Sequence, residues 1–333
     1  MSTAPRIVSL LPSATEIAVA LGFGEALVGR SHECDFPPAV SRLPVCTATK
    51  LAKGLPSIEI ERRVQALVQN GLSVYEVDAE LLRSLQPDVI LTQTQCAVCA
   101  VTPRDLEEAL SAWSGTQPAL LSLAPDNLDD VWGDIRRVAA ALDAADRAET
   151  VIDGLVARLE SLRDASASLT RPTVAALEWV EPLMAAGNWI PELIEIAGGA
   201  SLFARAGQHS PWLAWDDLIA ADPDHIILMP CGFQIPRTLE DIASLVDDPR
   251  WQSLSAVRAG RVAVADGHHF FNRPGPRLVE SAEILAEILH PDRFSFGHEG
   301  KAWVPVGAPD AAGRSPSTAR LRAAGSSAPA GAS

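Results

Sequence analysis

The chain has 333 residues, of which 47% are hydrophobic, and its 42 acidic and 27 basic side chains give a formal net charge of −15. This length suits two domains of roughly 100–200 residues each. The negative charge argues against a nucleic acid as partner, because such partners favour a basic surface. The sequence has no run of about 20 apolar residues and so predicts no membrane-spanning segment.

The first residues lack the pattern of a secretory signal. A strand is predicted almost at once, and Pro12, Thr15 and Glu16 interrupt the apolar stretch. As written, the sequence predicts a cytoplasmic protein. A start site further upstream would instead allow a periplasmic or cell-surface location. The five cysteines are an odd number, which favours reduced thiols over a complete disulfide framework.

Residues 1–126 alternate short apolar strands with helices, which predicts an N-terminal α/β lobe. The predicted strands are residues 7–11, 26–29, 89–91 and 119–123, and the predicted helices begin near Ser13 or cover residues 57–70 and 79–85. Ser13 and Glu16 have the spacing of a capping box, which marks the start of the first helix.

Residues 127–169 carry apolar side chains at helical spacing and contain no proline. A helix of about 40 residues would extend about 60 Å, which is longer than one lobe. We therefore expect one long helix that connects two lobes. The alternative is two ordinary helices that are broken near residues 144–146.

A second alternation covers residues 170–292 and predicts a C-terminal α/β lobe. Its predicted strands are residues 174–177, 226–229 and 262–265, and its closing helix covers residues 277–289. The fold class is thus two Rossmann-like lobes with central parallel sheets. Residues 293–333 are rich in Ala, Gly, Ser and Pro, and we expect them to be a disordered tail.

In both lobes, polar and aromatic clusters follow the predicted strands directly. Because ligands bind at the carboxyl ends of parallel strands, these loops predict a ligand-binding cleft between the lobes. The first-lobe candidates are Ser13, Thr15, His32, Glu33, Cys34, Asp35, Gln93, Cys96 and Cys99. The second-lobe candidates are Trp179, Asn188, Trp189, Trp212, Phe233, Phe271 and Arg273.

The thiols and the imidazole of the first lobe allow three interpretations. His32, Cys34, Cys96 and Cys99 could ligate a soft or borderline metal if their loops share one edge. Cys96 and Cys99 also form a C-x-x-C pair, which could be redox-active. Alternatively, the two cysteines pack as small apolar side chains.

The second lobe is distinguished by its aromatic side chains, since the chain has 8 Trp and only 1 Tyr. Indole rings at a cleft would suit a large, flat ligand, although each Trp could instead anchor its own loop. His268 and His269 are adjacent, and adjacent side chains on an extended loop point in opposite directions. Arg273 could hold a carbonyl-rich ligand or cap a helix.

Catalytic motifs are absent from the sequence, which has no Gly-rich phosphate loop, G-x-S-x-G elbow or His-Glu-x-x-His motif. We therefore expect a binding protein that is not an enzyme. The alternative from another class is a metal-binding or thiol-redox protein that uses His32, Cys34, Cys96 and Cys99.

Several segments resemble the substrate-binding proteins of cobalamin and iron-complex ABC importers, and most of all the members that bind cobalamin. The resemblance covers roughly residues 5–292 and rests on residues 6–16, 31–38, 85–90, 187–199 and 272–277. It implies two α/β lobes joined by one rigid helix, with the ligand between the lobes and no required cofactor. It also implies a small-molecule ligand, an ABC permease as candidate partner and a monomeric state.

The resemblance assigns roles to four positions. Trp212 and Arg273 fall where the cobalamin-binding members place cleft residues, and Glu80 and Asp216 fall where the family docks on its permease. Glu33 and Gln93 replace aromatic residues of those members, so two stacking surfaces are missing from the first lobe. We expect a cobalamin-like corrinoid as ligand, with a ferric chelate or another bound metal as alternatives.

Overall fold

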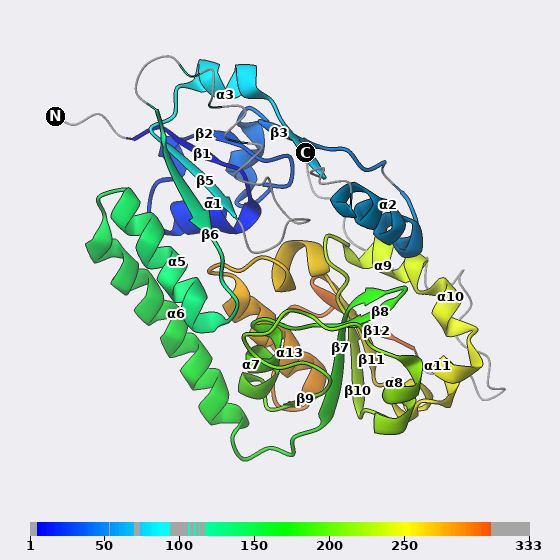
Figure 1. The fold of residues 1–333 in the computed structure, drawn as a ribbon. Coiled ribbons are helices and arrows are strands. Elements are labelled where there is room, and N and C mark those ends of the chain that lie inside the picture. Colours follow the sequence, from blue (N-terminus) through cyan, green and yellow to red (C-terminus); the bar gives the residue numbers. More distant parts are fainter. Residues whose placement is uncertain are drawn as a thin grey trace. The chain divides into compact units, whose positions relative to one another are not determined.

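The computed structural model describes residues 5–52, 54–69, 74–93, 106, 110, 113 and 117–307. The chain divides into two compact units. Unit 1 comprises Met1–Val156 with Pro274–Pro276, and unit 2 comprises Ala157–Arg273 with Arg277–Ser333. Each unit contains a central, mainly parallel sheet, so the predicted α/β class with two lobes is confirmed (Figure 1).

The sheet of unit 1 has four parallel strands in the order β2-β1-β5-β6. These strands are β1 (Ile7–Ser9), β2 (Leu27–Arg30), β5 (Val89–Gln93) and β6 (Ala119–Leu123), and a separate antiparallel pair is formed by β3 (Thr47–Thr49) and β4 (Tyr75–Val77). The helices are α1 (Pro12–Ala20), α2 (Ser57–Gln69), α3 (Ala79–Leu85) and α5 (Leu128–Ala141), with 3-10 turns η1 (Gly24–Ala26) and η2 (Pro38–Arg42).

The core of unit 1 explains why its strands are short and apolar. Val8 and Ile90, from neighbouring strands, pack with Leu82 of α3 in one buried cluster. Asp78 ends the preceding segment and caps α3, because its carboxylate accepts a hydrogen bond of 2.9 Å from the backbone N–H of Leu81. The four predicted strands of unit 1 correspond to β1, β2, β5 and β6, and the helix predicted at 79–85 is α3.

The expected single helix over residues 127–169 is wrong in one respect, because two helices occupy this stretch. These are α5 and α6 (Ala145–Ser166), as in the alternative with a break near residues 144–146. Asp143 has a φ of +54°, a left-handed value that a continuous right-handed helix excludes. The chain passes from unit 1 to unit 2 within α6, so a single helix of 22 residues joins the units.

Unit 2 has a six-stranded sheet in which β7, β10 and β11 are parallel. The strands are β7 (Thr173–Val180), β8 (Leu183–Ala185), β9 (Ala200–Ser201), β10 (His225–Leu228), β11 (Val262–Ala265) and β12 (Trp303–Val306). The helices are α7 (Ile190–Ile196), α8 (Trp215–Ala221), α9 (Ile235–Asp241), α10 (Ala243–Val246), α11 (Pro249–Ser253), α12 (Ser255–Arg258) and α13 (Leu278–Leu289), with the π-helical turn η3 (Gly267–Phe271).

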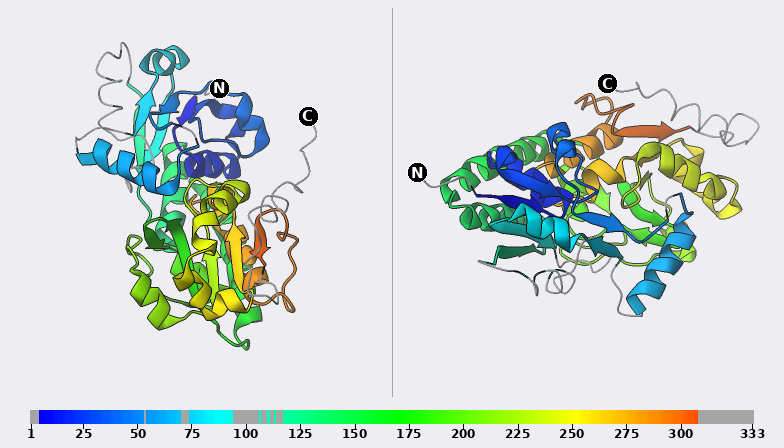
Figure 2. Two further views of the ribbon diagram at one scale, coloured as in Figure 1. Left: turned by 90° about the vertical axis from the view of Figure 1, so that its right-hand side faces the viewer. Right: turned by 90° about the horizontal axis from the view of Figure 1, so that it is seen from above.

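Helices flank the sheet of unit 2 on both sides. Figure 1 shows α7 and α13 on one side and α8 and α11 on the other, and Figure 2 gives two further views of them. Helix α13 packs against α7, while α9 contacts β11. The sheet is therefore covered on both faces, as expected for parallel strands that read as continuous apolar runs.

The expected disordered tail beginning at residue 293 is wrong as far as residue 307. Strand β12 pairs antiparallel with β11, so that Trp303 lies opposite Ala265. Glu287 of α13 fixes the connecting loop, since its carboxylate accepts hydrogen bonds from the backbone N–H groups of residues 296–298 and from Nε1 of Trp303. Composition suggested disorder, but these distant partners order the segment. Residues 308–333 lie outside the described part of the chain.

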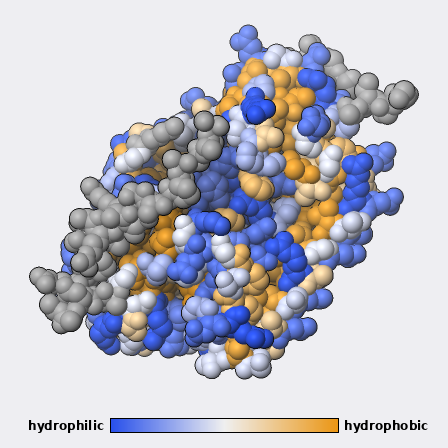
Figure 3. All heavy atoms as spheres, turned by 180° about the vertical axis from the view of Figure 1, so that it is seen from behind, coloured by the Kyte–Doolittle hydropathy of each residue, from blue (hydrophilic) through white to orange (hydrophobic). Residues whose placement is uncertain are grey.

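On the face drawn in Figure 3, hydrophilic and hydrophobic side chains both reach the surface. Trp212 is the most exposed of the large hydrophobic residues that the structure describes, with 52% of its surface accessible. Among the helices of the described residues, none combines the length and the apolar character needed to cross a bilayer.

Candidate functional site

The carboxyl ends of the unit 1 strands carry the predicted polar loops. Strand β1 leads directly into α1, where Ser13 and Thr15 are buried in the first turn. Strand β2 leads into the segment 31–35, and the backbone N–H of Ser31 donates to the carbonyl of Ser9 at 2.8 Å. Gln93 is the last residue of β5 and is also buried. The structure thus places these candidates at one edge of the unit 1 sheet, as parallel strands require.

The side chain of Cys34 packs inside unit 1, at this edge of the sheet. Its side chain is fully buried, and the hydroxyl of Thr15 donates to its sulfur at 3.1 Å. The sulfur in turn lies 3.9 Å from the carbonyl oxygen of Ser9, to which the thiol donates. A thiol held in this way is a small buried hydrophobe with a weak hydrogen bond. These contacts do not require a ligand, and a ligand or metal contact of Cys34 stays a prediction.

His32 is held by a different partner. Its backbone N–H donates to the hydroxyl oxygen of Thr47 at 3.1 Å, and its Nδ1 lies 2.8 Å from the same oxygen. The ring also contacts the ring of Tyr75, whose hydroxyl donates to Glu33 at 3.5 Å. The hydrogen bonds above join His32 and Cys34 to different neighbours, and their joint ligation of a metal stays a prediction. Cys96 and Cys99, on which the redox and metal hypotheses also rest, lie outside the described residues.

The carboxyl ends of the unit 2 strands bring aromatic side chains together. Trp179 is near the end of β7, and Phe233 follows β10. Their ring centroids are 5.3 Å apart at an angle of 52°, and the guanidinium of Arg237 lies 4.6 Å from the Phe233 centroid. Both aromatic residues were predicted candidates, and their contact follows because β7 and β10 are neighbours in the sheet.

The loop after β11 is a tight π-helical turn, so the extended conformation expected for His268 and His269 is wrong. Their ring centroids are 4.7 Å apart. Asp266 caps this turn, because one carboxylate oxygen accepts hydrogen bonds from the backbone N–H of His268 at 3.0 Å and of His269 at 2.9 Å. Position 267 must be glycine, since a Cβ there would lie 2.2 Å from the carbonyl oxygen of Pro230.

Arg273 ends this loop and is buried, with only 4% of its surface accessible. Its Nη2 lies 3.1 Å from Nε2 of His268. Because a guanidinium can only donate hydrogen bonds, Nε2 of His268 is the acceptor in this pair. The sequence predicted a ligand contact for Arg273 but gave no signal that His268 would be its partner.

Of the remaining candidates of unit 2, Trp189 and Asn188 are hydrogen-bonded within the unit, whereas Trp212 is exposed. Trp189 is buried and donates its Nε1–H to the carbonyl of Phe271 at 2.8 Å, so it anchors a loop, as the alternative interpretation of the Trp residues proposed. Asn188 donates its backbone N–H to Gln208 at 2.7 Å. Trp212 is instead exposed, and it forms a β-bridge with Met184 opposite Trp179. Trp212 thus lies at the level of the carboxyl end of β7.

Among the buried polar atoms of unit 2 that have no hydrogen-bond partner within the described residues, two belong to predicted candidates. They are the indole Nε1 of Trp179, which is a donor, and the side-chain oxygen Oδ1 of Asn188, which is an acceptor. Buried polar groups are satisfied in most native structures, and an unsatisfied one costs about 1–3 kcal/mol. Both residues were predicted ligand contacts, and a ligand with donors and acceptors would satisfy both atoms.

The two acidic residues that the resemblance assigns to docking are both exposed. Glu80 is in the first turn of α3, and Asp216 is in the first turn of α8. In each unit, the predicted docking carboxylate is therefore solvent-accessible and lies at a helix N-terminus.

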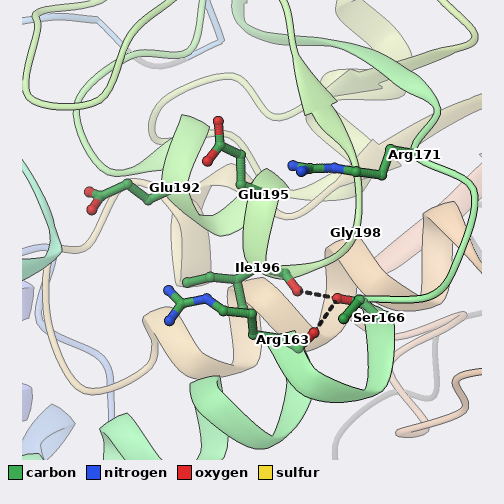
Figure 4. A pocket seen from close by; sticks show the side chains of 8 residues that line it. Arg163, Ser166, Arg171, Glu192, Glu195, Ile196 and Gly198 are labelled. Atoms are coloured by element: carbon green, nitrogen blue, oxygen red, sulfur yellow. Dashed lines mark hydrogen bonds between the residues drawn. The ribbon is translucent and has the colours of Figure 1, made fainter.

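A pocket of about 410 Å³ lies elsewhere in unit 2, at the end of α7 and before β7 (Figure 4). Its lining carries opposite charges from Arg163, Arg171, Glu192 and Glu195. Arg171 already donates to the carbonyl of Gly199 at 2.9 Å. Because Arg171 precedes β7, this pocket is at the amino end of that strand, away from the loops described above.

Comparison with known proteins yields a consistent result. Residues 7–268 match the family model described as periplasmic binding protein. The vitamin B12-binding protein of Vibrio cholerae is 26% identical over 291 residues, which cover 86% of this chain and 89% of that protein. An ABC transporter substrate-binding lipoprotein of Bacillus subtilis is 22% identical over 301 residues, which cover 87% of this chain and 81% of that protein.

Among solved structures, a periplasmic heme-binding protein from Pseudomonas aeruginosa has the same fold. It superposes with a TM-score of 0.66 at 20% identity, over 92% of this chain and 96% of that chain. The cytoplasmic location expected from the N-terminal residues finds no support here, because these similar proteins are periplasmic proteins and a lipoprotein.

Proposed function

The chain belongs to the periplasmic binding protein family, and we propose that it is the non-catalytic substrate-binding component of an ABC importer for a cobalamin-like corrinoid. The similarity to the vitamin B12-binding protein of Vibrio cholerae supports the class of ligand. The ligand-contacting groups would be the carboxyl-edge loops of each sheet. No cofactor beyond the captured complex is required by this role.

The observation that carries the choice of ligand is the pair of unsatisfied atoms in unit 2. Trp179 offers a buried donor and Asn188 a buried acceptor. A corrinoid carries several carboxamides at its rim, and each carboxamide is both a donor and an acceptor. A heme or an anionic iron chelate carries carboxylates or catecholates, which accept hydrogen bonds when ionised and cannot satisfy Asn188 Oδ1.

A heme or a ferric chelate is the second candidate. It is favoured by the similarity to a heme-binding protein of the same fold. The negative net charge of the chain and the surroundings of Arg273 argue against this second candidate. The formal net charge is −15, and Arg273, the predicted cleft cation, is buried against His268. An anionic chelate would need several well-placed cations.

We also propose a partner and a location. Glu80 and Asp216 are exposed carboxylates that would dock on basic side chains of the importer's permease. Because a docking protein must reach the outer face of the membrane, the proposed location is the periplasm or the cell surface. The similarity to a substrate-binding lipoprotein supports this location.

A selection experiment tests the function. The purified protein is incubated with equal concentrations of cyanocobalamin, hemin and a ferric catecholate, and the visible spectrum of the protein fraction is recorded after ultrafiltration. We expect stoichiometric retention of cyanocobalamin only. Retention of hemin or of the ferric chelate in its place would favour the second candidate, and retention of none would reject both.

A further inference from the structure

We propose that Arg30 is a positioning residue for ligand binding, because its guanidinium fixes the segment 31–35 that follows β2. This inference rests on the proposed function, since it takes the loops at the carboxyl edge of each sheet as the ligand contacts. Arg30 itself is not one of the predicted contacts. It acts through the backbone of the residues that are.

Arg30 is the last residue of β2, so its side chain starts where the strand passes into the loop. Its Nη1 donates to the carbonyl of Ser31 at 2.9 Å and to the carbonyl of Cys34 at 3.0 Å. Its Nη2 donates to the carbonyl of Ser41, in the turn η2, at 3.1 Å. One side chain thus holds three backbone carbonyls, two of them in the predicted ligand segment and one further along the loop.

The backbone of Arg30 closes the same loop at its far end. The N–H of Arg30 donates to the carbonyl of Pro44 at 2.9 Å, and its carbonyl accepts from the N–H of Cys46 at 2.8 Å. Residues 31–46, which connect β2 to β3, are therefore tied to one residue at their start and at their end. The guanidinium divides this loop into shorter closed pieces, and a shorter loop has less conformational freedom to lose.

The N–H groups of the segment are held by other partners. The N–H of Ser31 donates to Ser9, as described above, and the N–H of His32 donates to the hydroxyl oxygen of Thr47 at 3.1 Å. The N–H of Glu33 donates to the hydroxyl oxygen of Ser31 at 3.3 Å. Arg30 holds carbonyls of the segment while these partners hold its N–H groups, so the backbone is fixed from both sides. The directions in which its side chains leave the backbone are fixed with it.

An arginine suits this position better than a lysine. A guanidinium carries five N–H donors in a planar fork, whereas an ammonium group is a compact charge on a flexible stem. Hydrogen bonds from an ionised donor are also stronger than those between neutral groups. The Nε of Arg30 is buried and has no hydrogen-bond partner among the described residues, so the two Nη groups make the contacts to the loop.

The expected consequence is preorganisation of the first-lobe contacts. A loop that is already ordered loses little conformational freedom when a ligand binds, and its affinity is higher for that reason. The segment carries four predicted ligand contacts, which are His32, Glu33, Cys34 and Asp35. Loss of the guanidinium should therefore weaken binding although no group that touches the ligand is removed.

The test uses the full chain with Arg30→Met or Arg30→Lys, and cyanocobalamin is the probe. Affinity is measured by equilibrium dialysis, and backbone hydrogen exchange of residues 31–42 is measured on the ligand-free proteins. For Arg30→Met we expect at least about tenfold faster exchange in this segment. We also expect at least about tenfold weaker binding, equivalent to about 1.4 kcal/mol. Arg30→Lys keeps the charge but loses the fork, so both changes are smaller. It carries the test if Arg30→Met does not fold.

Arg6→Met is the matched control. The guanidinium of Arg6 also holds a backbone carbonyl of unit 1, because its Nε and Nη2 donate to Leu85 at 2.9 Å and 2.7 Å. Arg6 directly precedes β1, however, and so lies at the amino end of that strand. We expect Arg6→Met to keep the wild-type affinity and the wild-type exchange of residues 31–42.

The two measurements separate the inference from the proposed function. Wild-type affinity or wild-type exchange in a folded Arg30→Met, or equal losses in Arg6→Met, would overturn the positioning role while the proposed function stands. Failure of the wild type to bind cyanocobalamin would overturn the proposed function and, with it, the role of Arg30 in binding. The exchange measurement needs no ligand, so it would still decide whether Arg30 orders the loop.

Discussion

Trp189 donates its indole N–H to the carbonyl of Phe271, although 82 positions separate the two residues. The bond is 2.8 Å long and buried, and it ties the start of α7 to the turn after β11. That turn carries Asp266, His268 and His269. The indole of Trp189 therefore stabilises the turn that contains Phe271 and leads to Arg273, two of the predicted ligand contacts.

Replacement of Trp189 by Phe keeps an aromatic ring but removes the donor. We expect the free energy of unfolding to fall by about 1–3 kcal/mol, because the buried carbonyl of Phe271 loses its partner. Urea denaturation followed by circular dichroism measures this loss. Trp212→Phe is the control, because Trp212 is exposed and its replacement leaves the midpoint nearly unchanged. An unchanged midpoint in Trp189→Phe would contradict the anchoring role.

Cys34 and Cys46, the two buried cysteines among the described residues of unit 1, are expected to be chemically inert. Burial raises the pKa of the Cys46 thiol to about 11, and Cys34 is fully buried beside Thr15. Since the thiolate is the reactive form, neither should be alkylated in the native state at neutral pH. Peptide mass spectrometry after iodoacetamide treatment measures labelling at each site, with the partly accessible Cys231 as the internal comparison. Labelling of Cys46 faster than Cys231 would refute this prediction.

Much of the fold was predictable from local patterns. Short apolar strands that alternate with helices identify parallel α/β units, and the strands at 89–91 and 226–229 lie in β5 and β10. The break between α5 and α6 was less clear, because the apolar spacing continues through it and only the conformation of Asp143 ends the first helix. Strand β12 was missed because its partners, Ala265 and Glu287, are distant in sequence.

The candidate site was predictable only in outline. The loops after the strands were identified, and Trp179 and Phe233 do meet at the carboxyl ends of β7 and β10. The sequence could not show that Cys34 is buried against Thr15, since residue type alone does not separate a packed thiol from a ligand. It also could not show the different partners of His268 and His269, because a π-helical turn has no simple sequence signature.

His225 should make the stability of unit 2 depend on pH. Burial, together with the nearby charge of Arg261, lowers the pKa of His225 to about 4, although Asp224 acts in the opposite direction and His290 adds to the lowering. In the unfolded chain its pKa returns to about 6.5. As the pH falls, the unfolded state binds a proton on His225 before the folded state does. The contribution of His225 to the free energy of unfolding is therefore complete above pH 6.5 and declines as the pH falls towards 4.

The comparison of His225→Gln with the wild type isolates this effect. Free energies of unfolding are measured from pH 7.5 to 4, and the difference between the two proteins should shrink as the pH falls. Parallel curves for the two proteins over this interval would show that His225 does not titrate as its surroundings indicate.

Charge reversal tests the proposed docking residues. We expect Glu80→Lys and Asp216→Lys each to lower corrinoid uptake by at least about tenfold in cells that carry the matching permease, while binding of the ligand to the purified protein is retained. Glu160→Lys, at another exposed position on α6, is the matched control and should transport normally. Normal uptake by the double variant would show that these carboxylates do not dock.

The central claim is that this protein captures a corrinoid without chemistry, and isothermal titration with cyanocobalamin tests it most directly. The account predicts saturable binding of one corrinoid per chain at micromolar concentrations or below, with the corrinoid recovered unchanged. Absence of binding heat and of retained corrinoid under these conditions would contradict it.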